Sequence, residues 1–420
     1  MKIIRLKHIG TTILFSTLII STFLIPSMQV IDFTLSNNEI RLKSSATGVS
    51  NYSITSYVNY DVEINFSITQ NDENGTWYFK YPRLNDRQPE SPLTEYTPPY
   101  QVSELLYNSI SHPSTMVRDE FNNTYDLYNG TIFEGETITL SQHYNITLNK
   151  INFENIEYLD IEMSDYNLAD PMFTLYGNNT MLYYNTSDPE LVTLSNSITA
   201  GYTNPAMKAK RIIQWVASNI NYPDTPMPAQ EIGASAAYDN REGDCSEFSS
   251  LAVTLMRIQG IPARKVSGLL VTSNTDFQPA PGYTKTFTVD ESTSNFGGHA
   301  WIEYYIPTIG WVSCEPQRAD LWKTSSYLTF TQNIGQWFTF PDYYGNPENI
   351  SEFNGLYSGT SYGDFDFLYT FKLTVIDSYF PPGLDWFTII IIASIIGVVA
   401  VVSIVIIRTI IVKKRNKNAW

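Results

Sequence analysis

The feature that most constrains the fold of this chain is a change of hydrophobic periodicity near residue 197. Before that point, apolar and polar residues alternate, as in the run from Tyr60 to Ile68, which is the pattern of a half-exposed β-strand. After it, apolar residues recur at the three- and four-residue spacing of helices, and alternation then returns. A chain with this order packs helices against an antiparallel sheet, so we expect the α+β class.

Two helices are expected in the middle of the chain. The first begins with Asn204 as N-cap and Pro205 in the first turn, and is followed by apolar residues at Ala209, Ile212, Ile213, Val216 and Ile220. The second follows Asp244, with Glu247 as its capping-box partner, and ends at Gly260. Strands are expected at 265–272, 300–306 and 311–314, with one more at 371–376.

The two ends of the chain predict a membrane-anchored exterior protein. Positive residues at the N-terminus precede a short apolar run, which is typical of a signal peptide or of an uncleaved signal anchor. Residues 386–407 carry no charge and are long enough to span a bilayer, and basic residues follow at once, so the C-terminus is expected in the cytoplasm. The segments between the two ends hold nine N-x-S/T sequons, which support glycosylation outside the cell, at Asn51, Asn65, Asn74, Asn122, Asn129, Asn145, Asn178, Asn185 and Asn349.

These patterns divide the chain into six expected parts. They are a signal peptide or signal anchor (1–29), a mostly-β, sandwich-like extracellular domain (30–195), an α+β domain (196–330), an aromatic β-rich extension with a juxtamembrane spacer (331–385), a transmembrane helix (386–407) and a basic cytoplasmic tail (408–420). The net charge of −16 argues against a nucleic-acid partner, because no basic patch is expected that could neutralise phosphates. Two cysteines in 420 residues argue against a disulfide scaffold.

The candidate chemistry lies in the expected α+β domain. Cys245 stands at a helix start, where unpaired backbone N–H groups favour a thiolate, and His299 follows Gly297 and Gly298 at the start of a strand. A thiolate and an imidazole are the minimum parts of a nucleophile with its base. The alternatives stay open at this point, because a cysteine at a helix start is often only a small buried hydrophobe, and a lone histidine is often structural.

A carboxylate is expected to orient the imidazole of His299. Glu315 ends the strand after the one that carries His299, and an antiparallel hairpin would bring the two together. Glu303 is a rival, since it shares a strand face with His299. Cys314 points to the opposite face from Glu315, so we expect a buried thiol rather than a disulfide with Cys245. No pairwise ligand spacing or calcium loop occurs, so neither a metal nor a cofactor is expected.

Five motifs in this region resemble the transglutaminase-like superfamily. They begin at Arg211 (RIIQWVASNINY), Gly243 (GDCSEF), Gln259 (QGIPAR), Gly298 (GHAWIE) and Gly310 (GW), and they occur in the order of the family. The resemblance implies a papain-related α+β core, and a Cys–His–Asp triad that falls on Cys245, His299 and position 315. Glu315 stands where the family usually has Asp, and its extra methylene moves the carboxylate by ~1.5 Å. Gln317 also stands where a small hydroxyl residue is common.

The sequence therefore predicts a cell-surface thiol enzyme that acts on peptide or amide bonds of a peptide or protein substrate through a Cys245 thioester. Both hydrolysis and acyl transfer fit, in the manner of a cysteine peptidase, an amidase or a protein-glutamine acyltransferase. The alternative is a catalytically retired transglutaminase-like domain that serves as a surface binding or structural module. Glu315 in place of Asp and the large β region motivate that alternative.

Overall fold

The computed structural model describes residues 52–84, 97–177, 183–223, 231–290, 292, 297–335, 342–343, 364–381 and 403. These residues belong to one compact unit of the chain, residues 43–420. The expected leader at 1–29 and the expected transmembrane segment at 386–407 lie outside the described residues, apart from Ser403. Within the described ranges, no helix is both long and apolar enough to cross a membrane.

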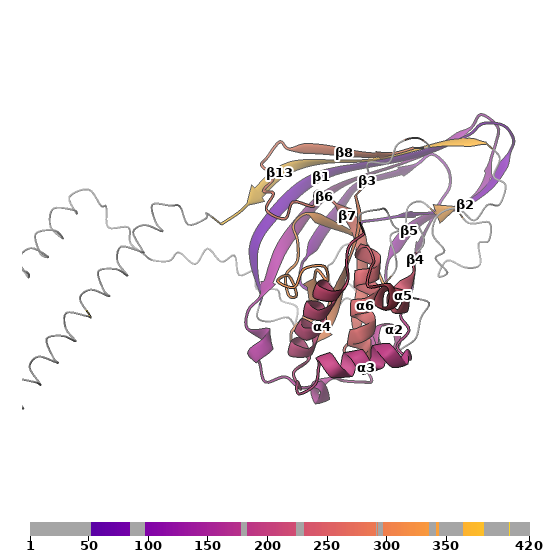
Figure 1. Cartoon of the computed structure of the whole chain (residues 1–420). Coiled ribbons are helices and arrows are strands. Elements are labelled where there is room, and N and C mark those ends of the chain that lie inside the picture. Colours follow the sequence, from indigo (N-terminus) through magenta and orange to yellow (C-terminus); the bar gives the residue numbers. More distant parts are fainter. Residues whose placement is uncertain are drawn as a thin grey trace, which may run out of the picture. The chain divides into compact units, whose positions relative to one another are not determined.

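Four helices cover one sheet in the middle of the chain (Figure 1). They are α3 (Pro189–Ile198), α4 (Pro205–Asn219), α5 (Gly233–Asn240) and α6 (Cys245–Ile258), and the short turns η1 (Ile156–Tyr158), η2 (Met163–Asp165) and α2 (Met172–Tyr176) precede them. The sheet has the antiparallel order β10-β9-β7-β11, formed by Gly310–Cys314, Gly298–Ile306, Ala263–Leu270 and Thr329–Ile334. The two expected helices and the three expected strands of this domain are thus confirmed, with bounds that differ by two residues or less.

The central helix α6 is buried on almost every side. All its residues from Cys245 to Arg257 are buried, because α3, α4 and α5 pack around it and β9 lies against it. The apolar side chains of these elements form one hydrophobic cluster with the inward face of β9 and β10. Burial of this kind fixes the start of α6 relative to β9, the strand that carries His299.

A five-stranded antiparallel sheet has the order β3-β6-β1-β13-β8. Its strands are Gln101–Ile110, Thr137–Phe153, Tyr52–Gln70, Phe365–Tyr379 and Thr284–Val289. Alternate residues of β1 are buried, as its period-two pattern predicts. A four-stranded sheet, β12-β2-β5-β4, is formed by Asp342–Tyr343, Gly75–Pro82, Thr124–Ile132 and Thr115–Arg118. Side chains of β2 and β5 share one hydrophobic cluster with β1, β6 and β13, as in a sandwich.

The five-stranded sheet takes strands from all three expected exterior parts. β1, β3 and β6 come from 30–195, β8 comes from 196–330, and β13 comes from 331–385 and contains the expected strand at 371–376. Periodicity predicts which segments are strands but not which strands pair, so this sharing was not foreseen. The domain boundaries at 195 and 330 stay predictions.

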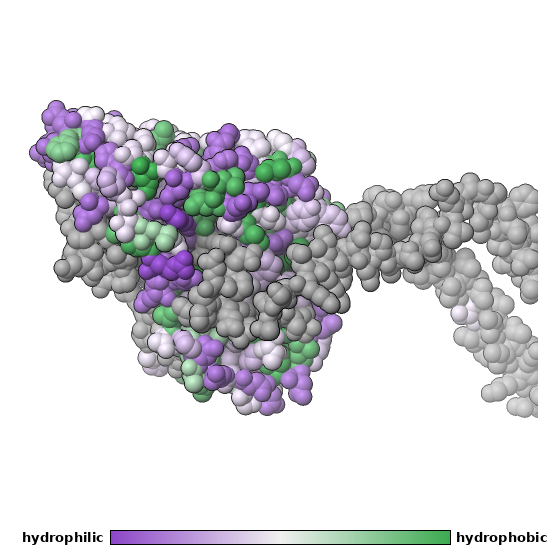
Figure 2. All heavy atoms as spheres, turned by 180° about the vertical axis from the view of Figure 1, so that it is seen from behind, coloured by the Kyte–Doolittle hydropathy of each residue, from purple (hydrophilic) through white to green (hydrophobic). Residues whose placement is uncertain are grey.

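On the face seen in Figure 2, hydrophobic residues of the described part lie scattered among hydrophilic ones. Exposed large apolar side chains include Leu106 and Tyr107 of β3, each about half exposed. Scattered apolar residues are ordinary on a folded surface and need no partner to explain them.

Candidate active site

The start of α6 is built by the five residues from Gly243 to Glu247. Asp244 is the N-cap, and its carboxylate accepts a hydrogen bond from the Ser246 N–H at 2.8 Å. Glu247 completes the expected capping box, because its carboxylate accepts from the Asp244 N–H at 3.1 Å. A side chain at Gly243 would place its Cβ only 2.3 Å from the Cβ of Glu247, so this turn requires glycine. Cys245 is therefore the first residue of α6, and it is only 7% exposed.

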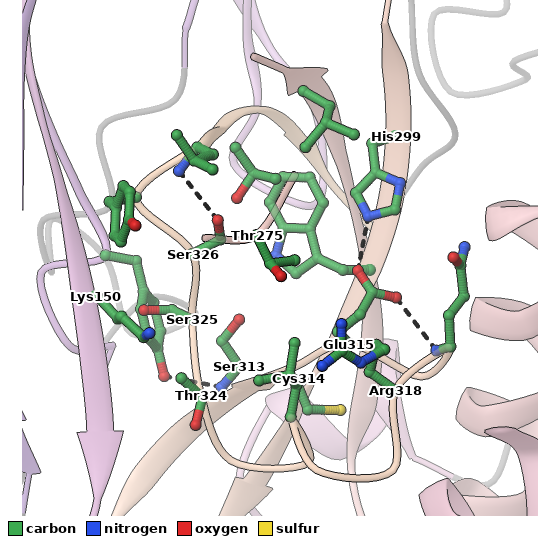
Figure 3. A pocket seen from close by; sticks show the side chains of 18 of the residues that line it. Lys150, Thr275, His299, Ser313, Cys314, Glu315, Arg318, Thr324, Ser325 and Ser326 are labelled. Carbon is green, nitrogen blue, oxygen red and sulfur yellow. Dashed lines mark hydrogen bonds and ion pairs between the residues drawn. The ribbon is translucent and has the colours of Figure 1, made fainter. Parts of the chain in front are cut away.

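His299 lies on β9 with its imidazole bonded to Glu315. Its Nε2 is 2.7 Å from Oε2 of Glu315, and a dashed line marks this contact in Figure 3. The two side chains are 12% and 20% exposed. The ring of Trp301 lies nearly parallel to the imidazole, with the ring centroids 6.0 Å apart. The imidazole is thus held by a charged hydrogen bond and by an aromatic neighbour on its own strand.

The hairpin of β9 and β10 brings Glu315 to His299, as the sequence predicts. The two strands are antiparallel, with Cys314 paired to Ile302, and Glu315 follows directly after β10. Its second carboxylate oxygen, Oε1, accepts a hydrogen bond from the Gln317 N–H at 3.3 Å. Both oxygens of Glu315 are therefore engaged, and the longer side chain reaches the imidazole.

The charge of His299 is set by its two neighbours. Burial alone lowers its pKa, but the negative charge of Glu315 and hydrogen bonds with Cys245 and Glu315 outweigh burial and raise the pKa to about 10. The Cys245 side chain thus lies within reach of the imidazole. Because Nε2 bonds Glu315, Nδ1 is the ring nitrogen left for Cys245.

Glu303 and Cys314 do not take part in the Cys245–His299–Glu315 group. Glu303, the rival orienter, instead forms a buried ion pair with Arg264, whose Nη2 lies 2.8 Å from Oε2 of Glu303. Cys314 is a free thiol with 1% exposure, and burial raises its pKa well above the usual range. Cys245 is also a free thiol, so the structure agrees with the expectation that the two cysteines form no disulfide.

Tyr222 is a neighbour of Cys245 to which sequence reasoning gave no role. The backbone N–H of Gly243 donates to Asn221 O at 3.1 Å, which places Tyr222 beside the turn that leads into α6. The Tyr222 ring stacks on Phe248, one turn after Cys245, with the centroids 6.5 Å apart. Tyr222 is 58% exposed, and its partial burial, together with the negative charges of Cys245, Asp244 and nearby carboxylates, raises its pKa to about 12. Its phenol is therefore protonated at neutral pH and can donate a hydrogen bond.

No metal centre accompanies the Cys245–His299–Glu315 group in the part of the chain that the structure describes. There, no three His, Cys, Asp or Glu side chains are gathered as metal ligands would be. The expectation of a site without metal or cofactor stays a prediction. The assignment of catalytic roles to these three residues likewise stays a prediction.

Comparison with known proteins finds a family model that this region matches. Residues 192–316 match the model of the Transglutaminase-like superfamily. Uncharacterized protein YebA of Bacillus subtilis is 32% identical over 136 residues, which are 31% of this chain and 18% of YebA. A protein-glutamine gamma-glutamyltransferase of Pseudomonas aeruginosa is 33% identical over 79 residues, which are 19% of this chain and 10% of that enzyme. The chain thus spans less than a fifth of either relative.

Solved structures with a similar arrangement include two bacterial proteins. A candidate cysteine protease from Cytophaga hutchinsonii has a TM-score of 0.46 at 15% identity, over 78% of this chain and 93% of that one. The periplasmic domain of TgpA from Pseudomonas aeruginosa has a TM-score of 0.30 at 14% identity, over 65% of this chain and 95% of that domain. The family match over residues 192–316 confirms the resemblance of the five motifs.

Proposed function

We propose that the transglutaminase-like domain of this chain is a thiol enzyme that cleaves or transfers peptide or side-chain amide bonds at the cell surface. Cys245 is the nucleophile, His299 carries the proton, and Glu315 orients His299. The observation that supports this most directly is the 2.7 Å contact between His299 Nε2 and Glu315 Oε2, on an imidazole that also interacts with Cys245. A nucleophile beside a base that a third group orients is the arrangement that covalent catalysis requires.

In this mechanism, a Cys245 thiolate attacks the carbonyl carbon of an amide, and the C=O π electrons move to the oxygen. The C–N bond then breaks as the protonated His299 gives its proton to the departing amine, which leaves an acyl thioester on Cys245. Water or a second amine attacks the thioester carbon, and neutral His299 accepts a proton from this attacking molecule. The C–S bond breaks, and the thiolate and the imidazolium are restored. Glu315 stabilises the imidazolium in both halves of the reaction.

We assign two donors to the oxyanion in this scheme. The backbone N–H of Cys245 belongs to the first turn of α6, where N–H groups have no partner within the helix. The Tyr222 phenol beside Cys245 is the second donor.

We expect Tyr222→Phe to lower kcat by about tenfold to a hundredfold without changing the rate of Cys245 alkylation, since the ring still stacks on Phe248. An unchanged kcat would remove Tyr222 from the mechanism.

The cell-surface location belongs to the same proposal. It is supported by the uncharged segment at 386–407, by the basic residues that follow it, and by the apolar N-terminal leader. With the catalytic domain outside the cell, the substrate is an extracellular peptide or protein. Water is the abundant acceptor there, so hydrolysis is favoured over transfer.

Thiol labelling of the native full chain tests the proposal. We expect iodoacetamide to modify Cys245 and to leave the buried Cys314 unmodified, with both thiols labelled after denaturation. A Cys314→Ala chain is the matched control and should show the same single native adduct. Cys245→Ala should show none. A native chain in which Cys245 resists labelling would contradict the proposal.

The alternative of a retired catalytic domain was motivated by Glu315 in place of Asp and by the large β region. The hydrogen bonds of both Glu315 oxygens favour the enzyme over this alternative. A Cys245→Ala chain that keeps every biological activity of the wild type would restore the alternative.

A further inference from the structure

A cavity of about 250 Å³ lies beside the His299–Glu315 pair. His299, Trp301 and Glu315 form one wall, Lys150 of β6 faces them, and the segment from Thr324 to Thr331 forms another wall (Figure 3). Cys245 does not line it. Pockets for drug-sized ligands measure ~300–1,000 Å³, so this smaller one suits a single amino-acid residue or a small organic group.

Most charges around this cavity are already neutralised. Glu315 is bonded to the protonated His299, Glu303 forms its ion pair with Arg264, and Arg318 pairs with Asp320 at 3.0 Å. The ammonium of Lys150 differs, because it has no hydrogen bond or ion pair with any residue that the structure describes. It lies only over the ring of Tyr327, 5.9 Å from the centroid.

A hydroxyl group with no partner points into the same cavity. Ser313 is only 3% exposed, and its hydroxyl makes no hydrogen bond within the described ranges, while Figure 3 shows it directed into the pocket. Its backbone is held in place, because the Ser313 N–H donates to the Tyr100 hydroxyl at 2.9 Å. That hydroxyl in turn donates to Trp311 O at 2.6 Å. The donor is therefore preformed rather than recruited from a mobile loop.

We propose that this pocket binds a carboxylate of the substrate through the Lys150 ammonium and the Ser313 hydroxyl. A carboxylate accepts from both donors, and it would supply the negative charge that Lys150 lacks among its described neighbours. Leu328, Trp301 and Tyr327 give the walls an apolar part that would hold the aliphatic stem of the acid. The assignment of the ligand as substrate rests on the proposed function, whereas the binding of an acid does not.

Binding of matched acid and amide probes to the full Cys245→Ala chain tests the pocket. N-acetylalanine carries a terminal carboxylate, N-acetylglutamate α-amide carries a side-chain carboxylate, and N-acetylalanine amide and N-acetylglutamine amide are their neutral counterparts. We expect at least one acid to bind about tenfold more tightly than its amide in isothermal titration or saturation-transfer NMR. The acid that shows the preference identifies the source of the carboxylate.

Two lysine variants provide the control for this experiment. Lys150→Met keeps the apolar stem and removes the charge, so it should abolish the preference for acid over amide. Lys372→Met removes a lysine of β13 that is paired with Glu63 on the surface, and it should leave the preference intact. A wild-type pocket without acid preference, or a preference that survives in a folded Lys150→Met chain, would overturn the proposal.

The two proposals fail separately. A chain whose Cys245 is labelled but which binds acid and amide equally contradicts only the carboxylate site. A chain that prefers the acid while native Cys245 resists labelling contradicts only the enzyme.

Discussion

Glu315 shows how a side chain longer than the usual one is accommodated at this site. Its Oε2 contacts His299 Nε2, and its Oε1 accepts a hydrogen bond from the Gln317 N–H. The turn after β10 therefore accommodates the longer carboxylate side chain. The expected hairpin in the sequence identified this residue as the partner of His299. The family pattern, which usually has Asp at this position, raised the question whether the extra methylene of Glu315 displaces the carboxylate. Whether the turn could take up that methylene depends on backbone placement, which no residue pattern contains.

Substitution of Glu315 tests how much the turnover rate depends on the position and charge of its carboxylate. Glu315→Gln keeps the length but loses the charge that stabilises the imidazolium, so we expect kcat to fall by about a hundredfold or more. Glu315→Asp keeps the charge but retracts it by about 1.5 Å, and we expect a smaller loss of about tenfold. Turnover of a peptide substrate measures both. Equal activity of all three forms would show that the carboxylate does not orient His299.

The raised pKa of His299 predicts a dependence of stability on pH. The folded pKa of about 10 exceeds the ordinary value of 6.5, so protonated His299 favours the folded state. That contribution is complete below pH 6.5 and is lost as the pH rises through 10. Denaturant unfolding at pH 6 and pH 10 should therefore show a drop in the unfolding free energy that a folded His299→Asn chain lacks. A parallel drop in both chains would refute this assignment of charge.

At the scale of elements, the start of α6 could be predicted almost completely. Asp244 and Glu247 specify the capping box, and the box places Cys245 at the first helical position. The partner of Glu303 was not foreseen, because Arg264 lies on β7, and only the pairing of Arg264 with Glu303 across β7 and β9 brings them together. Tyr222 was missed for a similar reason, since its neighbour Gly243 is close in space but distant along the chain.

Gly243 tests the packing of this element. Gly243→Ala would push a methyl group into the Cβ of Glu247, so we expect a loss of about 1–3 kcal/mol in unfolding free energy and a displaced Cys245. Ser246→Ala is the matched control in the same turn, because the buried Ser246 hydroxyl has no partner among the described residues and its removal costs little. Thermal unfolding measures both variants. A Gly243→Ala chain as stable as the control would contradict the predicted clash.

At the scale of the whole molecule, β13 joins parts that are distant in sequence. It lies between β1 and β8, and four of its side chains are buried in the hydrophobic cluster of the sheet: Tyr369, Phe371, Leu373 and Val375. β8 pairs only with β13 among the described strands, and it precedes the segment that leads to His299. The region that matches the family therefore depends on a strand outside it.

Truncation tests that dependence. A chain that ends at residue 335 keeps every residue of the family match but loses β13, so we expect it to be insoluble or to melt far below the wild type, since it exposes the sheet core. A chain that ends at residue 381 keeps β13 and should retain the wild-type melting temperature. If the shorter chain melted as the longer one does, the sheet would not support the family domain.

The pairing of β1 with β13 has a consequence for how the protein is made. Tyr57 pairs with Tyr379, so more than three hundred residues must be synthesised after Tyr57 before β13, the second neighbour of β1, can pair with it. Until then, one edge of β1 can pair with other chains, so the incomplete chain is exposed to aggregation. The five-stranded sheet is thus completed only after β13 has been synthesised.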